Sequence, residues 1–554
     1  MDSDYYQFTP TFGDQRDWVL PKVLEHQARV RSDKPYIQMA TDPPWTFAET
    51  NRQVNRLAHG LMQAGIGQRD RVLVLLPNCL DYVFLWFALD KVGALPILVN
   101  AQAIGAFLER PINASKATTL IVDRSFLPRI HEIAGSLEHL VTIYVRGSDE
   151  GLPGIRGFAL RHFLDLYSDT ETNPDAVVTY RDVGLVVGTG GTTGPSKSVL
   201  MPFGQFHLQA ETQASLVRLT DADVTLTAFP FFHLGALLQC IYPCLIQGAR
   251  AVIYENFSAS QWIDRVRLHG ATVTHFLGVT MDYVMKQPSR PEDSDNALRV
   301  VGAIPTAHSL LPEFRRRFGV DEVAELYGST EVGICMCTPW NTPRPAGAAG
   351  KLIRDYYEVR LVDSETDEDV PDGEIGECLV RPKLPWTSTL GYDGRPEETA
   401  ETMRNLWWHT RDLLRRDSDG WYYFVDRAAD ALRVGGENIA TYEVEEAILK
   451  HPNIVMCGVV GVPSDVEAGE QDVLAWIVLR PGDLLDPAAV IAFCESVMPR
   501  FAIPRYLRFV EELPRNEHGK MLKHTIRSSG ITSDTWDRVR EGAVLSRESI
   551  ARER

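Results

Sequence analysis

Apolar runs and amphipathic stretches alternate along the first part of the chain. Between residues 70 and 100, an apolar run at 72–76 is followed by a helix-like stretch at 82–92 and a second apolar run at 95–99. This order is typical of a strand, a crossover helix and a second strand. Similar runs, with helix-like segments between them, recur at 119–122, 183–187, 251–254 and 323–327. The pattern therefore predicts an α/β fold in which helices cover the sheets.

The pattern changes twice further along the chain. Beyond Gly350, short strands separated by turn residues indicate a small β-rich subdomain, with strands at 359–362, 377–380 and 421–425. After Arg427, helices at 441–450 and 487–498 and strands at 454–460 and 474–479 indicate a compact α+β unit. We therefore predict an N-terminal domain of residues 1–427 and a C-terminal domain of residues 428–554, and we expect the charged end after residue 528 to be an exposed helix or tail.

Composition narrows the classes of function. The formal net charge is −18 without a basic run, which argues against a nucleic-acid partner and an anionic membrane surface. The most apolar stretch, residues 229–246, is interrupted by His233 and Gln239, so we expect a buried element and no membrane insertion. The N-terminus lacks a secretory pattern, and the eight cysteines lack the companions of a zinc site. We expect a cytoplasmic protein with reduced, mostly buried thiols.

The strongest local signal is a loop rich in glycine and threonine that directly follows the apolar run 183–187. It reads Gly188-Thr-Gly-Gly-Thr-Thr-Gly-Pro-Ser-Lys197. Glycines allow the backbone to approach a ligand closely, hydroxyl groups can donate to phosphate oxygens, and the lysine adds a positive charge. The candidate phosphate-binding residues are Thr189, Gly190, Gly191, Thr192, Thr193 and Lys197. Taken alone, the same loop could be a flexible surface turn.

This loop resembles the phosphate loop of the adenylate-forming superfamily, which includes acyl-CoA synthetases, nonribosomal-peptide adenylation domains and beetle luciferases. The resemblance covers the chain from about Thr46 to Arg527 and rests on five motifs in the same order. It favours the acyl-CoA ligase branch. It implies a large N-terminal domain that binds the acid and ATP, and a smaller C-terminal domain that rotates between two half-reactions.

The second motif is Glu325-Leu-Tyr-Gly-Ser-Thr-Glu331. By resemblance, Tyr327 stacks on adenine, and Thr330 and Glu331 hold Mg²⁺ against phosphate oxygens. The segment Gly302-Ala-Ile-Pro305 loosely resembles the adenine-lining segment of the family. The further nucleotide-binding candidates in these two segments are Ala303, Ile304, Pro305, Glu325, Gly328 and Ser329.

The third motif surrounds Asp412. One carboxylate can accept hydrogen bonds from both ribose hydroxyls, and Asp412 matches the ribose-binding residue of the family. Arg427 matches an arginine that contacts ribose and phosphate. Arg411 and Asp426 stand where relatives have glycine, and both tolerate the backbone angles of glycine less well.

Two further motifs carry the candidate catalytic residues. Lys520 lies in Leu513-Pro-Arg-Asn-Glu-His-Gly-Lys520, which resembles the C-terminal loop whose lysine stabilises the adenylation transition state. His233, in Phe231-Phe-His-Leu-Gly235, matches the residue that gates the pantetheine tunnel. Gly435 and Gly436 correspond to the segment that faces this tunnel during thioester formation, and Ala429 occupies the hinge position.

The segments that correspond to the acid pocket are apolar and rich in small residues. The candidate residues are Phe232, Gly235, Gly278, Gly302 and Gly333. Relatives that activate amino acids have an aspartate near His233, which is missing here. The sequence therefore predicts a bulky, apolar acid without an α-amino group.

Together these features predict a ligase that uses ATP, Mg²⁺ and coenzyme A to convert a carboxylic acid into an acyl-adenylate and then into an acyl-CoA thioester. Three alternatives stay open: a ligase that loads a carrier protein, a luciferase-like oxygenase and a nucleotide-binding protein without catalysis. The sequence leaves the acid and the oligomeric state open, with a homodimer among the arrangements considered.

Overall fold

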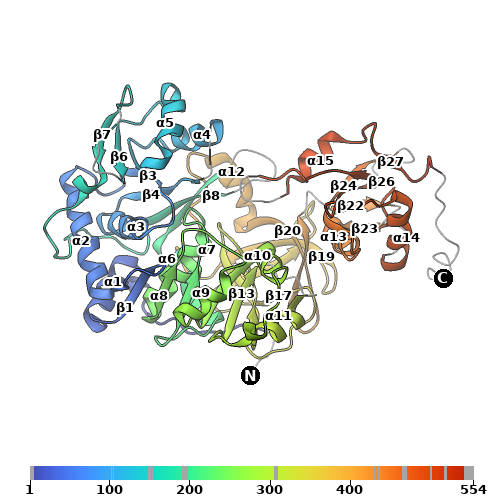
Figure 1. Cartoon of the computed structure of the whole chain (residues 1–554), viewed down its shortest axis with the longest axis horizontal. Coiled ribbons are helices and arrows are strands. Elements are labelled where there is room, and N and C mark those ends of the chain that lie inside the picture. Colours follow the sequence, from blue (N-terminus) through green and yellow to red (C-terminus); the bar gives the residue numbers. More distant parts are fainter. Residues whose placement is uncertain are drawn as a thin grey trace.

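The computed structural model describes residues 5–541 apart from 102, 104, 148–150, 153, 190–196, 305–309, 428–430, 435–436, 465–470, 499–501 and 517–520. Figure 1 shows a large body that contains the N-terminal and middle parts of the chain, with a smaller unit, coloured orange to red, beside it. The predicted α/β class, with its smaller C-terminal unit, is confirmed. The boundary between residues 427 and 428 stays a prediction.

The first sheet has the strand order β7-β6-β5-β3-β4-β8-β9. Its neighbouring strands are parallel except β8 and β9, which form an antiparallel pair. The predicted strand, helix and strand at residues 72–99 are β3, α3 and β4. The elements of this layer are β3 (Arg71–Leu75), α3 (Leu80–Val92), β4 (Leu95–Leu98), α4 (Ala106–Ser115), β5 (Thr119–Asp123), α5 (Leu127–Ile133), β6 (Thr142–Arg146), β7 (Ala159–His162), β8 (Val183–Thr189) and β9 (Lys197–Pro202).

The second sheet has the order β14-β13-β12-β10-β11-β1-β2 and is parallel apart from the β1–β2 pair. Its strands are β1 (Pro35–Met39), β2 (Trp45–Thr46), β10 (Val224–Thr227), β11 (Arg250–Ile253), β12 (Val273–Leu277), β13 (Val300–Ile304) and β14 (Glu322–Ala324). The helices of this part are α1 (Leu20–Val30), α2 (Phe47–Gln63), α6 (Phe203–Leu216), α8 (Tyr242–Gln247), α9 (Trp262–His269), α10 (Gly278–Met285) and α11 (Leu311–Phe318). Helix α6 is buried along nearly its whole length.

The third sheet is antiparallel, with the order β15-β16-β17-β21-β20-β19-β18. Its strands are β15 (Leu326–Ser329), β16 (Gly333–Cys337), β17 (Ala348–Leu352), β18 (Tyr357–Val362), β19 (Ile375–Pro382), β20 (Trp408–Arg416) and β21 (Trp421–Arg427). The prediction of one strand at residues 323–327 was wrong. The chain leaves the second sheet after β14 and enters the third sheet at β15, so Glu325 lies at the junction between two sheets.

The C-terminal unit combines a two-stranded ribbon with a four-stranded sheet. Its elements are β22 (Ala431–Val434), β23 (Glu437–Ala440), α13 (Thr441–Leu449), β24 (Ile454–Pro463), β25 (Gln471–Leu479), α14 (Pro487–Val497), β26 (Tyr506–Phe509), α15 (Lys523–Ser529) and β27 (Trp536–Asp537). The prediction of an exposed helix or tail after residue 528 was partly wrong. Strand β27 pairs with β26, and Arg505 holds the carboxylate of Asp537, so the chain stays attached to the sheet to that point.

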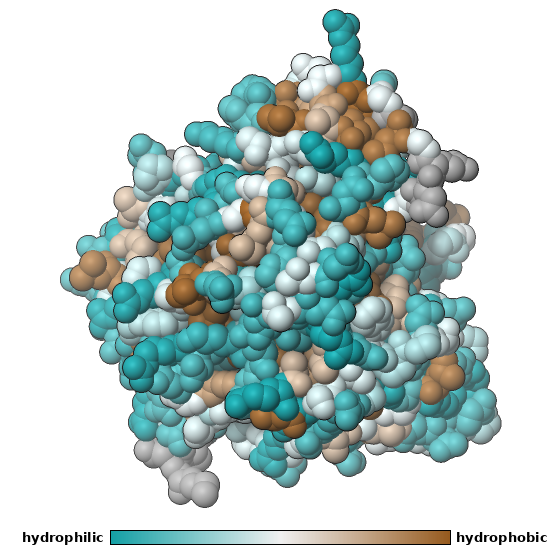
Figure 2. Space-filling view, turned by 90° about the vertical axis from the view of Figure 1, so that its left-hand side faces the viewer, coloured by the Kyte–Doolittle hydropathy of each residue, from teal (hydrophilic) through white to brown (hydrophobic). Residues whose placement is uncertain are grey.

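Residues 229–246 form the expected buried element. Helices α7 (Leu234–Ala236) and α8 are joined by a π-helical segment, Leu237–Ile241. Within the described residues, no helix is long and apolar enough to cross a membrane. All eight cysteines are buried and free. Figure 2 shows that the face at the left of Figure 1 is mostly hydrophilic, with apolar residues gathered in small groups.

Candidate functional site

The glycine- and threonine-rich loop connects two antiparallel strands. Thr189, the last residue of β8, pairs directly with Lys197, the first residue of β9. The chain therefore returns along the same sheet, which fixes both ends of the loop. Gly190, Gly191, Thr192 and Thr193 lie outside the described residues, and their role in binding phosphate stays a prediction.

Lys197 brings this loop into contact with two other parts of the chain. Its Nζ atom lies 2.6 Å from Oε2 of Glu398 on α12 (Pro396–Thr402) and 4.6 Å from the centre of the Tyr392 ring. The hydrogen bond from Lys197 lowers the pKa of Glu398. Tyr392 in turn donates a hydrogen bond of 3.1 Å to Oε1 of Glu331. The base of the loop and the candidate Mg²⁺-binding carboxylate are thus joined through one tyrosine.

The backbone that carries Thr330 and Glu331 is held by a buried amide. Gln205 Nε2 donates to the carbonyl oxygens of Thr330 at 2.8 Å and Glu331 at 3.0 Å. The backbone N–H of Thr389 also donates to the Glu331 oxygen, at 2.8 Å. Sequence reasoning missed Gln205, because α6 carries several polar residues and its sequence does not show which of them is buried against the nucleotide motif.

Tyr327 and Asp412 meet although they come from different strands. Tyr327 Oη donates to Asp412 Oδ2 at 2.8 Å, and both side chains are buried. Burial raises the pKa of Tyr327. Asp412 lies opposite Arg427 in the β20–β21 pair. The predicted adenine and ribose residues are therefore in direct contact, and Arg427 lies opposite Asp412 in the neighbouring strand. The hinge position, Ala429, lies outside the described residues.

Gly328 allows the turn between β15 and β16 to close. A Cβ atom at this position would lie 2.1 Å from the carbonyl oxygen of Gly333, well inside van der Waals contact. Ser329 accepts a hydrogen bond from the N–H of Val332 through its Oγ atom. These two residues shape the backbone that presents Thr330 and Glu331.

Arg411 has a backbone φ of 60°, in the left-handed region, where the family has glycine. We expect Arg411→Gly to raise the midpoint of thermal unfolding by about 1–2 °C, because relief of the left-handed strain outweighs the greater entropy of glycine in the unfolded chain. The hydrogen bond from the backbone N–H to Glu377 Oε1 does not need the side chain. Arg411→Ala, which keeps the strain, is the control, and an equal gain for it would contradict the backbone explanation.

The remaining nucleotide candidates occupy two different environments. Ala303 and Ile304 lie on β13, and Pro305 lies outside the described residues. Glu325 forms a buried ion pair with Arg344, and burial lowers the pKa of that arginine to about 10. The carboxylate of Glu325 is therefore bound within the protein, which favours a structural role at the junction between the sheets.

Hydrogen bonds from α3 and from the turn before it hold the loop that carries Phe232 and His233. Asn78 accepts a hydrogen bond from the N–H of Phe231 and donates to the carbonyl oxygen of Phe229, and Tyr82 donates to the oxygen of Phe231. His233 is half-buried and its ring lies 4.5 Å from that of Phe232. The structure thus gives His233 a defined position at the start of α7.

The glycines of the candidate acid pocket do not open space by themselves. A Cβ atom on Gly302 would lie 2.5 Å from His275, one on Gly333 would lie 2.8 Å from the Tyr357 hydroxyl, and one on Gly235 would lie 3.3 Å from Phe229. Gly278 begins α10. Because neighbours occupy the space beside three of these glycines, the argument from small residues to a roomy pocket loses its support.

The candidate catalytic loop of the C-terminal unit is closed at its base. Arg515 and Met521 form an antiparallel bridge, and the N–H of Leu522 donates to the oxygen of Pro514. Lys520 lies within this loop but outside the described residues. Gly435 and Gly436 are outside them too, and their neighbours in the sequence, Val434 and Glu437, pair in the β22–β23 ribbon. The roles of Lys520, Gly435 and Gly436 stay predictions.

The residues present fit a magnesium ion that is bound mainly through its substrate. Among the described residues, no group of three His, Cys, Asp or Glu side chains forms a metal site. Glu331 offers one carboxylate, which is linked to Lys197 through the Tyr392 side chain. Mg²⁺ commonly takes one or two protein carboxylates and completes its shell with phosphate oxygens and water, so this donor set is sufficient.

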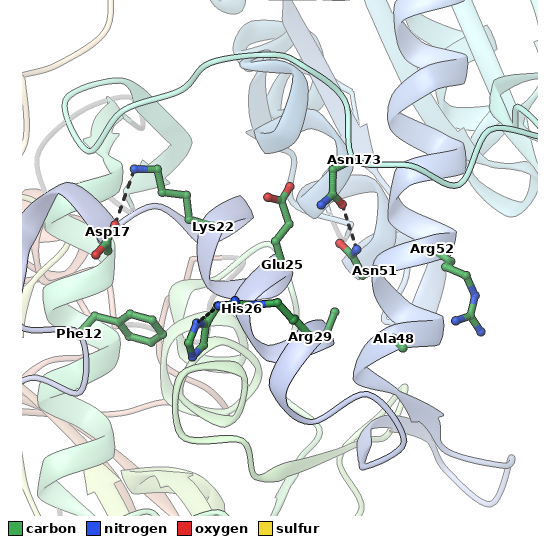
Figure 3. Close-up of a pocket in the computed structure, with 11 residues that line it drawn as sticks. Phe12, Asp17, Lys22, Glu25, His26, Arg29, Ala48, Asn51, Arg52 and Asn173 are labelled. Carbon is green, nitrogen blue, oxygen red and sulfur yellow. Dashed lines mark hydrogen bonds and ion pairs between the residues drawn. The ribbon is translucent and has the colours of Figure 1, made fainter.

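A hollow of about 740 Å³ lies away from these motifs, on the N-terminal helices. Figure 3 shows side chains of α1 and α2 around it, with Lys22 facing Asp17 and Asn51 facing Asn173. The buried ammonium of Lys91 lies nearby, bound to Glu25, Asn51 and Asn173. Charges of both signs line the hollow, and none of the motif residues lines it.

Comparisons with known proteins show which families and relatives the chain is similar to. The family model described as AMP-binding enzyme matches residues 24–392, and the model of the AMP-binding enzyme C-terminal domain matches residues 443–520. A crotonobetaine/carnitine–CoA ligase of Salmonella agona (strain SL483) is 31% identical over 493 residues, which cover 87% of this chain and 93% of that protein.

Two solved structures are similar over nearly the whole chain. The anthranilate CoA ligase AuaEII in complex with anthranoyl-AMP is 25% identical, with a TM-score of 0.81 and coverage of 96% of this chain and 99% of that one. ATP-bound MatB from Rhodopseudomonas palustris, at 24% identity and a TM-score of 0.81, covers 92% and 98% and shares the fold.

Proposed function

Because this chain belongs to the AMP-binding enzyme family and is an ATP-dependent acyl-CoA synthetase, we propose that it activates a largely apolar carboxylic acid without an α-amino group. It uses ATP, Mg²⁺ and coenzyme A. The single observation that carries the site assignment is the Tyr327–Asp412 hydrogen bond of 2.8 Å, since it joins two motifs that lie 85 residues apart in the sequence.

The first half-reaction forms a bond between a carboxylate oxygen of the acid and the α-phosphorus of ATP. Pyrophosphate leaves with the electron pair of the broken phosphoanhydride bond. Anionic groups meet in this step, so positive charge lowers its barrier. Lys197 serves the phosphates at the base of the loop, and Lys520 is the cation that the C-terminal unit contributes. Mg²⁺, when bound at Glu331, neutralises phosphate charge.

In the second half-reaction the thiolate sulfur of coenzyme A attacks the acyl carbonyl, and AMP leaves with the mixed-anhydride oxygen. The attacking sulfur belongs to the substrate, so the protein needs no nucleophile of its own. Its task is to exclude water and position the thiol. His233, fixed at the start of α7, gates the thiol path, and the segment with Gly435 and Gly436 closes it.

The preference for acids without an α-amino group follows from the side chains near His233. An ammonium in a buried site needs a carboxylate or several oxygen acceptors. The matched segment Phe231–Gly235 contains none. The bulk of the acid is a separate question, since neighbours fill the space beside three of the pocket glycines, Gly235, Gly302 and Gly333.

A substrate screen tests the proposed function. We expect AMP formation that depends on coenzyme A with at least one aryl, alicyclic or fatty acid, and none with amino acids. The measurement is the release of pyrophosphate and AMP with and without coenzyme A. Activation of amino acids only would contradict the argument from His233, and acyl transfer only to a carrier protein would favour that alternative.

A further inference from the structure

Helix α6 carries three glutamines on one face. Gln205, Gln209 and Gln213 are spaced by four residues, which places them one above the other along the helix. Gln205 holds the backbone of Thr330 and Glu331, Gln209 Nε2 lies 3.2 Å from the position of a Cβ on Gly333, and Gln213 lies beside Gly302. The row thus runs from the nucleotide motif to the predicted acid pocket, and we call it the glutamine row.

The far end of the glutamine row forms a buried polar pair. Gln213 Nε2 lies 2.8 Å from His275 Nε2, and the two side chains are 1% and 7% exposed. His275 on β12 pairs in register with Gly302 on β13, whose missing side chain makes room for the imidazole ring. Val273 and Val300, also on this side of the sheet, belong to the apolar core, so the pair is a polar spot in apolar surroundings.

This pair leaves hydrogen-bonding capacity unused. Within the described part of the chain, Gln213 Oε1 and His275 Nδ1 are buried and make no hydrogen bond. Burial lowers the pKa of His275 to about 3, so the imidazole is neutral and has one donor and one acceptor nitrogen. Whichever way the amide is turned, the pair offers at least one donor and one acceptor. Buried polar groups in this state normally meet a partner.

The spacing along α6 relates the pair to the nucleotide motif. Gln213 follows Gln205 by eight residues, which corresponds to about 12 Å along a helix. An acid whose carboxylate lies near Thr330 and Glu331 would therefore reach the pair with the end remote from its carboxylate. A hydroxyl group both donates and accepts one hydrogen bond, which is the complement of the pair.

We propose that the acid carries a hydroxyl group remote from its carboxylate and that Gln213 and His275 recognise this group. The inference rests on the proposed function and names the substrate class more narrowly, as a hydroxylated, otherwise apolar acid. Both residues are then specificity-determining residues that act in acid binding.

The test compares matched acids in the full-length enzyme. Aryl-alkanoic and alicyclic acids of graded length, each with and without a terminal hydroxyl group, are assayed for kcat/KM by pyrophosphate release. For the best-fitting length, we expect the wild type to prefer the hydroxylated acid by about 10²-fold, because the analogue without it leaves both polar groups unpaired. Equal kcat/KM values within every pair would overturn the inference and would point to a buried water at this position.

Variants then assign the preference to the pair. Gln213→Met and His275→Phe should each reduce the preference about tenfold, mainly through KM for the hydroxylated acid, and the double variant should abolish it. Gln38→Met is the matched control. Gln38 is also a buried glutamine whose Oε1 has no hydrogen-bond partner among the described residues, and it lies on β1, three strands from β12.

The outcomes separate the two proposals. Acyl-CoA formation with an unchanged preference in both variants would overturn the inference and leave the proposed function standing. If the wild type formed no acyl-CoA with any of the acids, both the inference and the proposed function would be overturned. If one variant fails to fold, the other variant and the wild-type comparison still decide the inference.

Discussion

Replacement of Lys520 by alanine is expected to lower the rate of pyrophosphate release by about 10²–10³-fold. The reason is the loss of a positioned cation where an acid carboxylate meets the α-phosphate, a charge that is needed in the transition state. The measurement is single-turnover adenylation with saturating ATP and acid. Thioester formation from a supplied acyl-adenylate should change much less, because Lys520 serves the first half-reaction in our proposal.

The matched control is Lys450→Ala, since Lys450 is an exposed lysine at the end of α13 in the same C-terminal unit. It should leave both half-reactions unchanged. Pyrophosphate release by Lys520→Ala at the wild-type rate would contradict the proposed mechanism, whatever the effect on stability.

Replacement of Asp412 by alanine is expected to reduce kcat/KM for ATP by about 10²–10⁴-fold. Two charge-assisted hydrogen bonds to the ribose hydroxyls would be lost, each contributing about 1.5–3 kcal/mol. Tyr327→Phe removes the hydrogen bond to Asp412 Oδ2 but keeps the carboxylate and the aromatic face. It should therefore lower kcat/KM for ATP by only about tenfold or less.

Steady-state kinetics with varied ATP checks both changes. Asp372→Asn is the control, because Asp372 pairs with Arg416 at the surface, and surface ion pairs contribute little. An effect of Tyr327→Phe as large as that of Asp412→Ala would mean that the tyrosine hydroxyl, and not the carboxylate, is the group that matters.

Hydrophobic periodicity predicted the strands and helices of the parallel sheets well, because these segments are continuous and bounded by polar turns. It failed at residues 323–327. Both β14 and β15 are apolar and short, and the passage from one sheet to the next at Glu325 depends on tertiary contacts such as the ion pair with Arg344. The sequence did not predict the attachment of β27 through Arg505 either, because this attachment also depends on tertiary contacts.

The candidate site was predicted by its motifs but its supporting residues were not. Tyr327 and Asp412 meet as the motifs imply, and Glu331 lies near Lys197 through Tyr392. The glutamine row escaped notice because α6 is buried on nearly all sides and shows no clear apolar and polar faces. A sequence also does not show which neighbour lies beside a glycine, such as His275 beside Gly302 or Tyr357 beside Gly333.

The pair between Lys197 and Glu398 also affects how phosphate reaches the site. The carboxylate lies 2.6 Å from the ammonium, so an anion that arrives there must displace a resident competitor. A triphosphate with its metal can do this through several simultaneous contacts, whereas a monophosphate makes fewer. In the proposed mechanism the carboxylate of Glu398 on α12 is therefore the counter-ion that the nucleotide displaces from Lys197, and it returns when the nucleotide leaves.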